Sequence, residues 1–175
     1  MMSESKSVNY KRATATKVLS ELITRVRVIN TANTEYLKVS NLYVFGSYLK
    51  GTPTVHDLDI ALDFEYTPYY YKQYRKFLRA SGIADIATAQ KIESNRLAFN
   101  VYLTEEVFGH YSVSYLNKLV GLESEYYKRL KNRSRVLSFH PVKELGYLEL
   151  DADDVVCLVS DGKIQTAKLN KLLAS

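Results

Sequence analysis

Residues 45–64 read FGSYLKGTPTVHDLDIALDF, and this segment decides the fold and the chemistry that we expect. A turn at Gly46 and Ser47 comes first, and the pair Asp57 and Asp59 follows, with Asp57 ten residues after Ser47. Side chains alternate between the two faces of a strand, so the two aspartates share one face while apolar side chains fill the other. The segment therefore predicts a tight turn followed by a strand that carries two carboxylates side by side.

The residues around this segment predict further strands and helices. Residues 42–45 read LYVF and predict a short buried strand that leads into the turn. Apolar residues recur at helical spacing across 15–26, and Thr67 followed by Pro68 is typical of a helix start. Residues 97–103 read LAFNVYL, and their alternation predicts a third strand. This order of elements favours an α/β (α+β) fold, in which helices flank a small mixed sheet.

We expect the chain to divide near residue 107. Residues 1–107 contain the first helix, the turn and the aspartate strand, and they are predicted to form one α/β domain. Residues 108–175 keep mostly helical spacing of apolar positions, with Asp161 and Gly162 as a turn between two helices. They are therefore expected to form a helical C-terminal extension packed on the α/β domain.

The aspartate pair is suited to a divalent cation. Strand residues rise about 3.3 Å each, so the Cα atoms of Asp57 and Asp59 are expected roughly 6.6 Å apart. Magnesium takes one or two carboxylates and completes its shell with water and substrate phosphate oxygens. Gly46 allows close backbone approach to a phosphate, the Ser47 hydroxyl can donate to it, and Lys50 can neutralise part of its charge. These residue types predict a metal-assisted site for a nucleoside triphosphate.

The same residues resemble the catalytic core of the nucleotidyltransferase superfamily, which includes DNA polymerase beta and the small stand-alone, or minimal, nucleotidyltransferases. The shared signature is an apolar strand, Gly-Ser, a gap of about ten residues, and Asp-x-Asp on the next strand. The resemblance implies a small mixed-sheet palm flanked by helices. It implies that Gly46 and Ser47 hold the β- and γ-phosphates of an NTP such as ATP. It also implies that Asp57 and Asp59 are catalytic and bind Mg²⁺ or Mn²⁺.

Asn100 is the one departure from the pattern of that superfamily. The family usually places a third carboxylate at the centre of a later strand, and Asn100 occupies the matching position in the predicted strand 97–103. Its amide oxygen could bind the metal weakly, although an amide cannot accept a proton. A structural amide that caps a neighbouring loop is the alternative. Activity thus depends on whether two carboxylates suffice.

Composition narrows the classes of protein to consider. The chain has 175 residues, 46% hydrophobic and 25% charged, which suits a folded domain of ordinary size. No apolar run is long enough to span a membrane, and the first residues lack the apolar segment of a secretory signal, so we expect a cytoplasmic protein without membrane partners. Cys157 is the only cysteine, which excludes an intramolecular disulfide. A net charge of +5 favours polyanionic partners.

The leading hypothesis is an enzyme that transfers NMP from an NTP to a hydroxyl acceptor and releases pyrophosphate. The acceptor could be an RNA 3′ end, a protein side chain or a small molecule. The basic stretch 128–135 favours RNA, although a solvated helix face is the plain alternative reading. A second hypothesis is a catalytically silent nucleotide- or RNA-binding module, and a third is an antitoxin-like partner protein of the same fold.

Overall fold

The computed structural model describes residues 9–82, 89–108, 121–148 and 150–174. The chain forms two compact units. The first unit comprises Met1–Ala32, Lys38–Glu65 and Leu130–Ser175, and the second comprises Asn33–Leu37 and Tyr66–Arg129. Helices and strands both contribute, so the expected mixed α/β class is confirmed. The units do not follow the boundary expected near residue 107, because C-terminal residues join the first unit.

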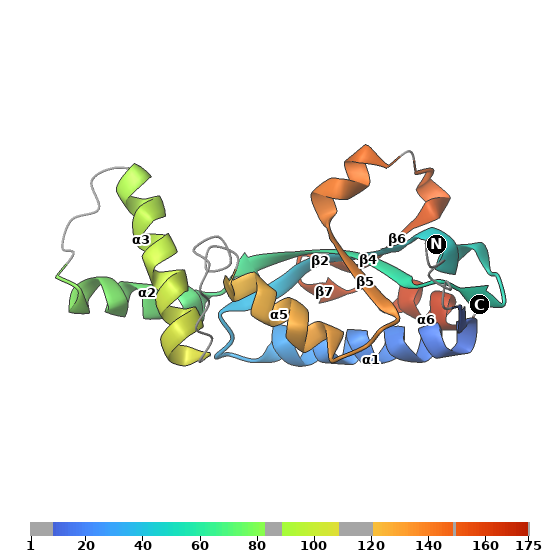
Figure 1. Cartoon of the computed structure of the whole chain (residues 1–175), viewed down its shortest axis with the longest axis horizontal. Coiled ribbons are helices and arrows are strands. Elements are labelled where there is room, and N and C mark those ends of the chain that lie inside the picture. The colour runs from blue at the N-terminus through green and yellow to red at the C-terminus, as the bar shows by residue number, and fades with distance from the viewer. Residues whose placement is uncertain (1–8, 83–88, 109–120, 149, 175) are drawn as a thin grey trace, which may run out of the picture. The chain divides into compact units, whose positions relative to one another are not determined.

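A five-stranded mixed sheet forms the centre of the first unit (Figure 1). Its order is β5-β4-β2-β6-β7, in which β4 and β5 run parallel while β6 is antiparallel to both β2 and β7. The strands are β2 (Leu37–Phe45), β4 (Leu58–Tyr66), β5 (Leu137–Pro141), β6 (Val155–Ser160) and β7 (Lys163–Ile164). A separate two-stranded pair joins β1 (Tyr10–Lys11) to β3 (Thr54–Val55).

Helix α1 (Arg12–Thr31) supplies one layer of the core of the first unit. Its apolar side chains recur every three or four residues, so one stripe is buried while the opposite face stays exposed. The buried members of the stripe are Ala15, Leu19, Leu22, Ile23, Val26 and Ile29. The sheet contributes the fully buried Leu58, Ile60 and Leu62 of β4. Helix α6 (Thr166–Ala174) contacts β6 and buries Leu169 and Leu172.

Three short helical turns connect the strands of the first unit. They are η1 (Gly46–Lys50), η3 (Val142–Tyr147) and η4 (Ala152–Asp154). The first, η1, follows β2 directly, and Gly51 closes it in the left-handed conformation. The turn at Gly46 and Ser47 is therefore held at the end of a buried strand.

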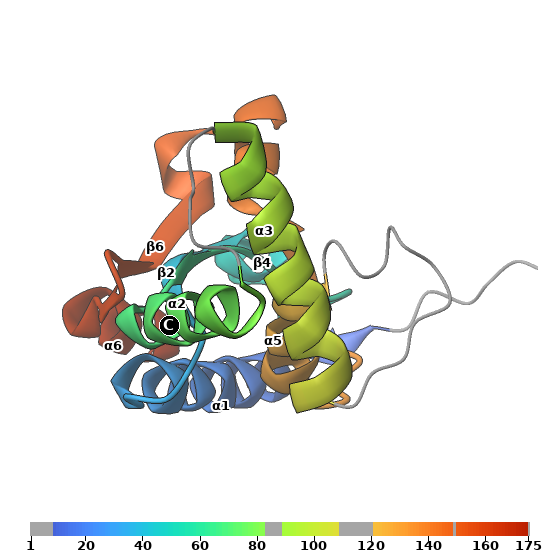
Figure 2. The same cartoon turned by 90° about the vertical axis from the view of Figure 1, so that its left-hand side faces the viewer.

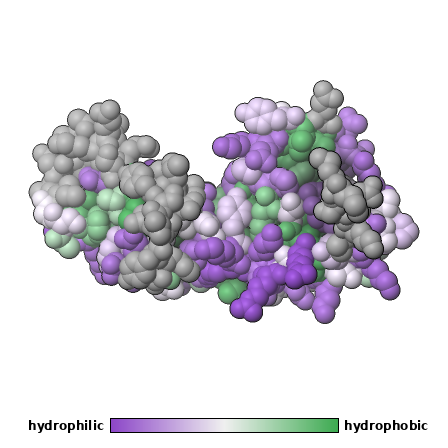
Figure 3. All heavy atoms as spheres, viewed as in Figure 1, coloured by the Kyte–Doolittle hydropathy of each residue, from purple (hydrophilic) through white to green (hydrophobic). Residues whose placement is uncertain are grey.

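Helices make up most of the second unit, and Figure 2 shows α3 crossing α2. They are α2 (Pro68–Ala80), α3 (Ala89–Tyr102), a π-type turn η2 (Leu103–Val107) and α5 (Gly121–Lys131), which runs on into the first unit. The Thr67 hydroxyl accepts a hydrogen bond from the N–H of Tyr70 and Pro68 occupies the first turn, so the expected start of α2 is confirmed. The face shown in Figure 3 has hydrophilic residues gathered over α5.

The third strand expected over 97–103 is wrong, because these residues lie in α3 and the turn that follows it. Buried positions come in pairs, Phe99 with Asn100 and Leu103 with Thr104, which is the four-residue repeat of a helix. A short apolar run fits either period, so the sequence pattern alone could not separate them.

The helical extension expected over 108–175 is also corrected. Residues 109–120 lie outside the described residues, but β5, β6 and β7 all come from this part of the chain and join the sheet. Asp161 and Gly162, expected between two helices, instead connect β6 to β7 with φ of 50° and 76°. Positive φ at both positions is the geometry of a two-residue hairpin turn.

No helix in the described ranges is long and apolar enough to cross a lipid bilayer.

Candidate functional site

The turn after β2 and the strand β4 meet at Gly46 and Asp59. Gly46 has φ of +77°, and a Cβ atom added there would lie 2.5 Å from Oδ2 of Asp59. A side chain at position 46 would therefore force the carboxylate to move, and only glycine adopts this φ without strain. The two halves of the sequence motif are thus in direct contact in the folded unit.

Ser47 places a buried hydroxyl beside this contact. Its Oγ is inaccessible to solvent and has no hydrogen-bond partner among the residues that the structure describes. A buried polar atom without a partner costs about 1–3 kcal/mol, so native proteins rarely keep one without a reason. Among the described residues, the Ser47 hydroxyl is therefore uncommitted as a donor at the Gly46–Ser47 turn.

Asp57 and Asp59 interact as a carboxylate pair. Asp57 immediately precedes β4, and Asp59 is half-buried on its second residue. Burial raises the pKa of Asp59, the charge of Asp57 raises it further, and His140 acts in the opposite direction. Two carboxylates that repel one another gain from a shared cation. The pair, together with the unpartnered Ser47 hydroxyl, fits magnesium bound with substrate phosphates, which needs only one or two protein carboxylates.

His140 on the neighbouring strand β5 contacts Asp59. The parallel register places Ser138 opposite Asp59, and Nε2 of His140 lies 3.5 Å from Oδ1 of Asp59 and 3.1 Å from Oγ of Ser138. Its Nδ1 lies 3.2 Å from Oε2 of Glu144, and its ring packs edge-on against Phe45 at 5.3 Å. These contacts on both nitrogens fix the imidazole beside the carboxylate pair.

Sequence reasoning missed His140. The sequence shows three histidines far apart, and nothing local reveals that β5 pairs with β4. The available signal was the alternation of Ser138 and His140 in the short apolar segment 137–141, which suits a strand. The partner of that strand is a long-range contact, and a single sequence does not show it.

Asn100 lies in α3 of the second unit, so the strand on which its metal-binding role depended does not exist. Its Oδ1 accepts a hydrogen bond from the hydroxyl of Tyr70 at 2.9 Å, and its Nδ2 donates to the hydroxyl of Tyr66 at 3.3 Å. Both ends of the amide are therefore used inside the helical unit. This arrangement supports the structural alternative, although the partners are aromatic side chains rather than a loop.

Lys50 is exposed at the end of η1 and remains the candidate for phosphate charge on this turn. Within the described ranges, no group of three or more His, Cys, Asp or Glu side chains is arranged to hold a metal ion. Among the described residues, the site therefore offers two carboxylates rather than a closed metal cage.

The basic stretch 128–135 does not form a free cationic surface at its N-terminal end. Lys128 pairs with Glu125 at 2.7 Å, and Arg129 pairs with Glu35 through two hydrogen bonds of 2.7 and 2.6 Å. Both carboxylates lie in the second unit. These two cations thus stabilise the local fold, which weakens the case for an RNA contact at this stretch.

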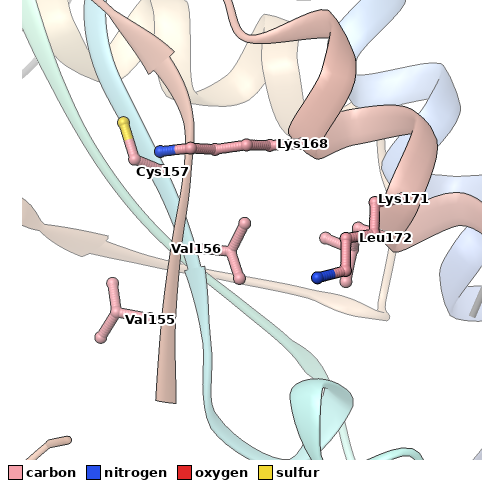
Figure 4. Close-up of a pocket in the computed structure, with 6 residues that line it drawn as sticks. All are labelled: Val155, Val156, Cys157, Lys168, Lys171 and Leu172. Carbon is pink, nitrogen blue, oxygen red and sulfur yellow. The ribbon is translucent and has the colours of Figure 1, made fainter. Parts of the chain in front are cut away.

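A separate pocket of about 280 Å³ lies against β6 and α6 in the first unit (Figure 4). Lys168 extends from α6 across the strand toward Cys157, and Leu172 points toward Val156. None of the residues predicted for the nucleotide site belongs to the described lining of this pocket. It is therefore not the site that the motif forms.

Comparison of the chain with protein-family models, with curated proteins and with solved structures finds no match. The functional argument therefore depends on the motif residues and on the contacts described above.

Proposed function

We propose that the protein is a magnesium-dependent nucleotidyltransferase that moves NMP from an NTP to a hydroxyl acceptor. The observation that carries the proposal is the contact between Gly46 and Asp59. Gly46 has no side chain, and this leaves room for the carboxylate of Asp59. Gly46 and Asp59 are thirteen residues apart in the chain, yet they are in contact in the fold. This juxtaposition is what phosphate binding next to a metal-binding pair requires.

In the proposed reaction, the acceptor oxygen attacks the α-phosphorus, the bond to the β-phosphate oxygen breaks, and pyrophosphate leaves. The acceptor hydroxyl gives up its proton to water as its oxygen bonds to the α-phosphorus. Magnesium held by Asp57 and Asp59 would supply charge neutralisation at the phosphates. Gly46 would let the main chain approach the triphosphate, while the Ser47 hydroxyl would donate to a phosphate oxygen. His140 would hold Asp59 in position through its 3.5 Å contact.

Most of the rate would come from positioning and charge stabilisation, because phosphoryl-type transfer needs little covalent help from the protein. A shell of fixed partners supports this reading: His140 is held by Glu144, Phe45 and Ser138, so it does not need to reorganise when substrate binds. Preorganised groups of this kind are what such a mechanism uses.

The silent nucleotide- or RNA-binding module is the second candidate. The observation that favours it is the lack, among the described side chains, of a third carboxylate that joins the pair. Such a module would bind NTP at the same turn without releasing pyrophosphate. No contact among the described residues favours the antitoxin-like alternative.

The test is transfer of label from each α-³²P NTP, with Mg²⁺ or Mn²⁺, to total RNA and to cell protein. The wild type is compared with Asp57→Ala/Asp59→Ala and with the matched control Asp63→Ala, which lies on the same strand. We expect labelling by the wild type and the control, and none by the double variant. Nucleotide binding without label transfer would favour the silent module. If the protein neither binds nucleotide nor transfers label, the proposed nucleotide site is refuted.

A further inference from the structure

Helix α2 carries a stripe of basic side chains, which we call the α2 stripe. Its members stand at i, i+3, i+4 and i+7, so they share one helix face. They are Lys72, Arg75, Lys76 and Arg79, and all four are exposed. The segment Pro68–Ala80 contains no acidic residue. Among the residues that the structure describes, none forms an ion pair with the stripe.

A pocket of about 480 Å³ adjoins the stripe between α2 and α3, within the second unit. Its lining combines flat aromatic rings with polar groups from α2. The residues that matter here are Tyr36, Phe77, Phe99 and Tyr102 as rings, with Gln73 and Lys76 as polar members. Lys76 belongs to both features, because positions 73, 76, 77 and 80 form the neighbouring row of the same helix. The charged stripe and the aromatic pocket are therefore continuous.

The rings of the pocket form a connected group that leaves part of Tyr102 free. Phe77 lies 5.3 Å from both Phe99 and Tyr102 between ring centroids, and Tyr102 is 42% exposed. Burial, together with Tyr69, raises the pKa of Tyr36 to about 12, so its hydroxyl stays neutral and able to donate at physiological pH. An aromatic wall with neutral donors and amides suits a planar, hydrogen-bonding ligand.

We propose that the α2 stripe and this pocket together bind single-stranded nucleic acid, with phosphates along the stripe and a base against the aromatic rings. Proteins that bind single strands combine these two elements, a basic track for the backbone and aromatic rings on which bases stack. The inference deepens the proposed function, because it names a nucleic acid as the acceptor class. It relies on that function only for this last step, since binding itself can be measured without transfer.

A solvated helix face is the simpler explanation for a basic stripe, and α1 shows what such a face looks like. There Glu21 lies between Lys17 and Arg25 at four-residue intervals and pairs with Arg25 at 3.9 Å. Helix α2 has no such alternation of sign, and its stripe borders a pocket instead of open solvent alone. An acidic peptide would satisfy the charge but gives the flat rings no planar partner, so a nucleic acid fits both features better.

The test is fluorescence anisotropy of the full chain with labelled single strands of roughly 12 nucleotides, in RNA and DNA versions, without NTP or metal. The stripe variant replaces all four members by Gln. The matched control replaces Lys11, Lys17, Arg27 and Lys163, four exposed cations outside the stripe, so both variants lose four positive charges. We expect at least a tenfold weaker affinity for the stripe variant and less than a twofold change for the control.

Salt dependence separates phosphate contacts from stacking. For single strands the slope of log K against log salt is about −0.7 per phosphate contact, so four contacts predict roughly −3 for the wild type and a value near zero for the stripe variant. Tyr102→Ala is expected to weaken binding roughly 5- to 100-fold with the wild-type slope retained. Tyr71→Ala, a control at 43% exposure and outside the described pocket lining, should change little. Thermal unfolding of each variant identifies any loss that follows from misfolding.

Three results would overturn the proposal: no binding of either strand at 50 mM salt, equal losses in the stripe and control variants, or binding of an acidic peptide as tight as that of the oligonucleotides. Asp57→Ala/Asp59→Ala should bind strands like the wild type. A wild-type protein that binds strands but transfers no label from any NTP would count against the proposed activity alone. Tighter binding of the RNA strand would identify RNA as the acceptor. Tighter binding of the DNA strand would identify a DNA end as the acceptor instead.

Discussion

At the scale of single residues, Gly46 carries most of the argument. The chain needs glycine there for two separate reasons, the φ of +77° and the 2.5 Å approach of Oδ2 of Asp59 to the place of a side chain. Gly51 shares only the first reason, because its φ is +71° but nothing lies within 4 Å. Comparing a substitution at Gly46 with one at Gly51 therefore distinguishes the effect of backbone strain from the effect of a displaced Asp59 carboxylate.

Gly46→Ala and Gly51→Ala should each cost about 1–2 kcal/mol of unfolding free energy, because alanine is strained at positive φ. Only Gly46→Ala should also push the carboxylate of Asp59 out of place, and we expect it to lose transfer activity while Gly51→Ala keeps it. Urea unfolding and label transfer on both variants measure the two effects. Equal activity of the two variants would show that the contact does not matter for function.

Asp59 should reduce stability at neutral pH. Burial and the charge of Asp57 raise its pKa, so the folded protein binds this proton more readily than the unfolded chain does. The contribution of Asp59 to stability therefore becomes more favourable as pH falls. We expect Asp59→Asn to raise Tm by roughly 1–3 °C at pH 7, with the difference shrinking as the pH falls toward about 4, the ordinary pKa of an aspartate in the unfolded chain. Asp63→Asn, on the same strand, is the control and should leave Tm unchanged. A lower Tm for Asp59→Asn would contradict this account of the site.

Asn100→Asp tests the corrected role of this residue. The amide donates to Tyr66 and accepts from Tyr70, so a carboxylate would lose the donor and place a charge in a buried position. We expect a loss of about 2 kcal/mol of unfolding free energy at pH 7, reduced at pH 4, where the protonated acid can donate again. Chemical denaturation of the variant and the wild type at the two pH values measures this loss of unfolding free energy. A stable variant with increased transfer would restore the metal-binding hypothesis.

At the scale of elements, the local signals succeeded where the pattern was long or chemically specific. The first helix, the start of α2 at Thr67 and the strand after the motif all follow from periodicity and capping residues. The assignment of 97–103 failed because a run of seven mostly apolar residues fits both a strand and a helix. The pairing of β5 with β4, and with it the place of His140, depends on residues about eighty positions apart, which local patterns do not encode.

A hydrogen-bond cluster around Tyr126 on α5 illustrates such long-range dependence within the second unit. Its hydroxyl accepts from the backbone N–H groups of Tyr36 and Leu37, at 2.9 and 3.2 Å, and donates to Glu35 at 2.6 Å. Burial acts to raise the pKa of Glu35, but hydrogen bonds from Arg129 and Tyr126 outweigh it and lower the pKa. One hydroxyl thus joins α5 to the segment that precedes β2.

Tyr126→Phe removes the oxygen that satisfies the two backbone donors, one of them buried. We expect a loss of about 2 kcal/mol of unfolding free energy, measured by urea denaturation. Tyr147→Phe, at a residue that is 84% exposed, is the control and should lie within about 0.5 kcal/mol of the wild type. If both variants unfold alike, the cluster contributes nothing to stability.

At the scale of the whole molecule, three separate segments build the first unit, and the described C-terminal residues supply three of the five strands of its sheet. The sequence predicted a division near residue 107 because the last strands are short, and the apolar run of β6 fits a helix as well as a strand. The structure differs because these strands join the sheet of the first unit. The motif site needs both parts, since β5 from the C-terminal part holds His140 against Asp59.

Pyrophosphate release is the measurement that tests the central claim most directly. Purified protein would be incubated with each NTP, magnesium and total RNA, beside Asp57→Ala/Asp59→Ala and Asp63→Ala. The account predicts release by the wild type and Asp63→Ala that stops when magnesium is chelated, and none by the double variant. Equal release by the double variant, or no release with any NTP, would contradict it.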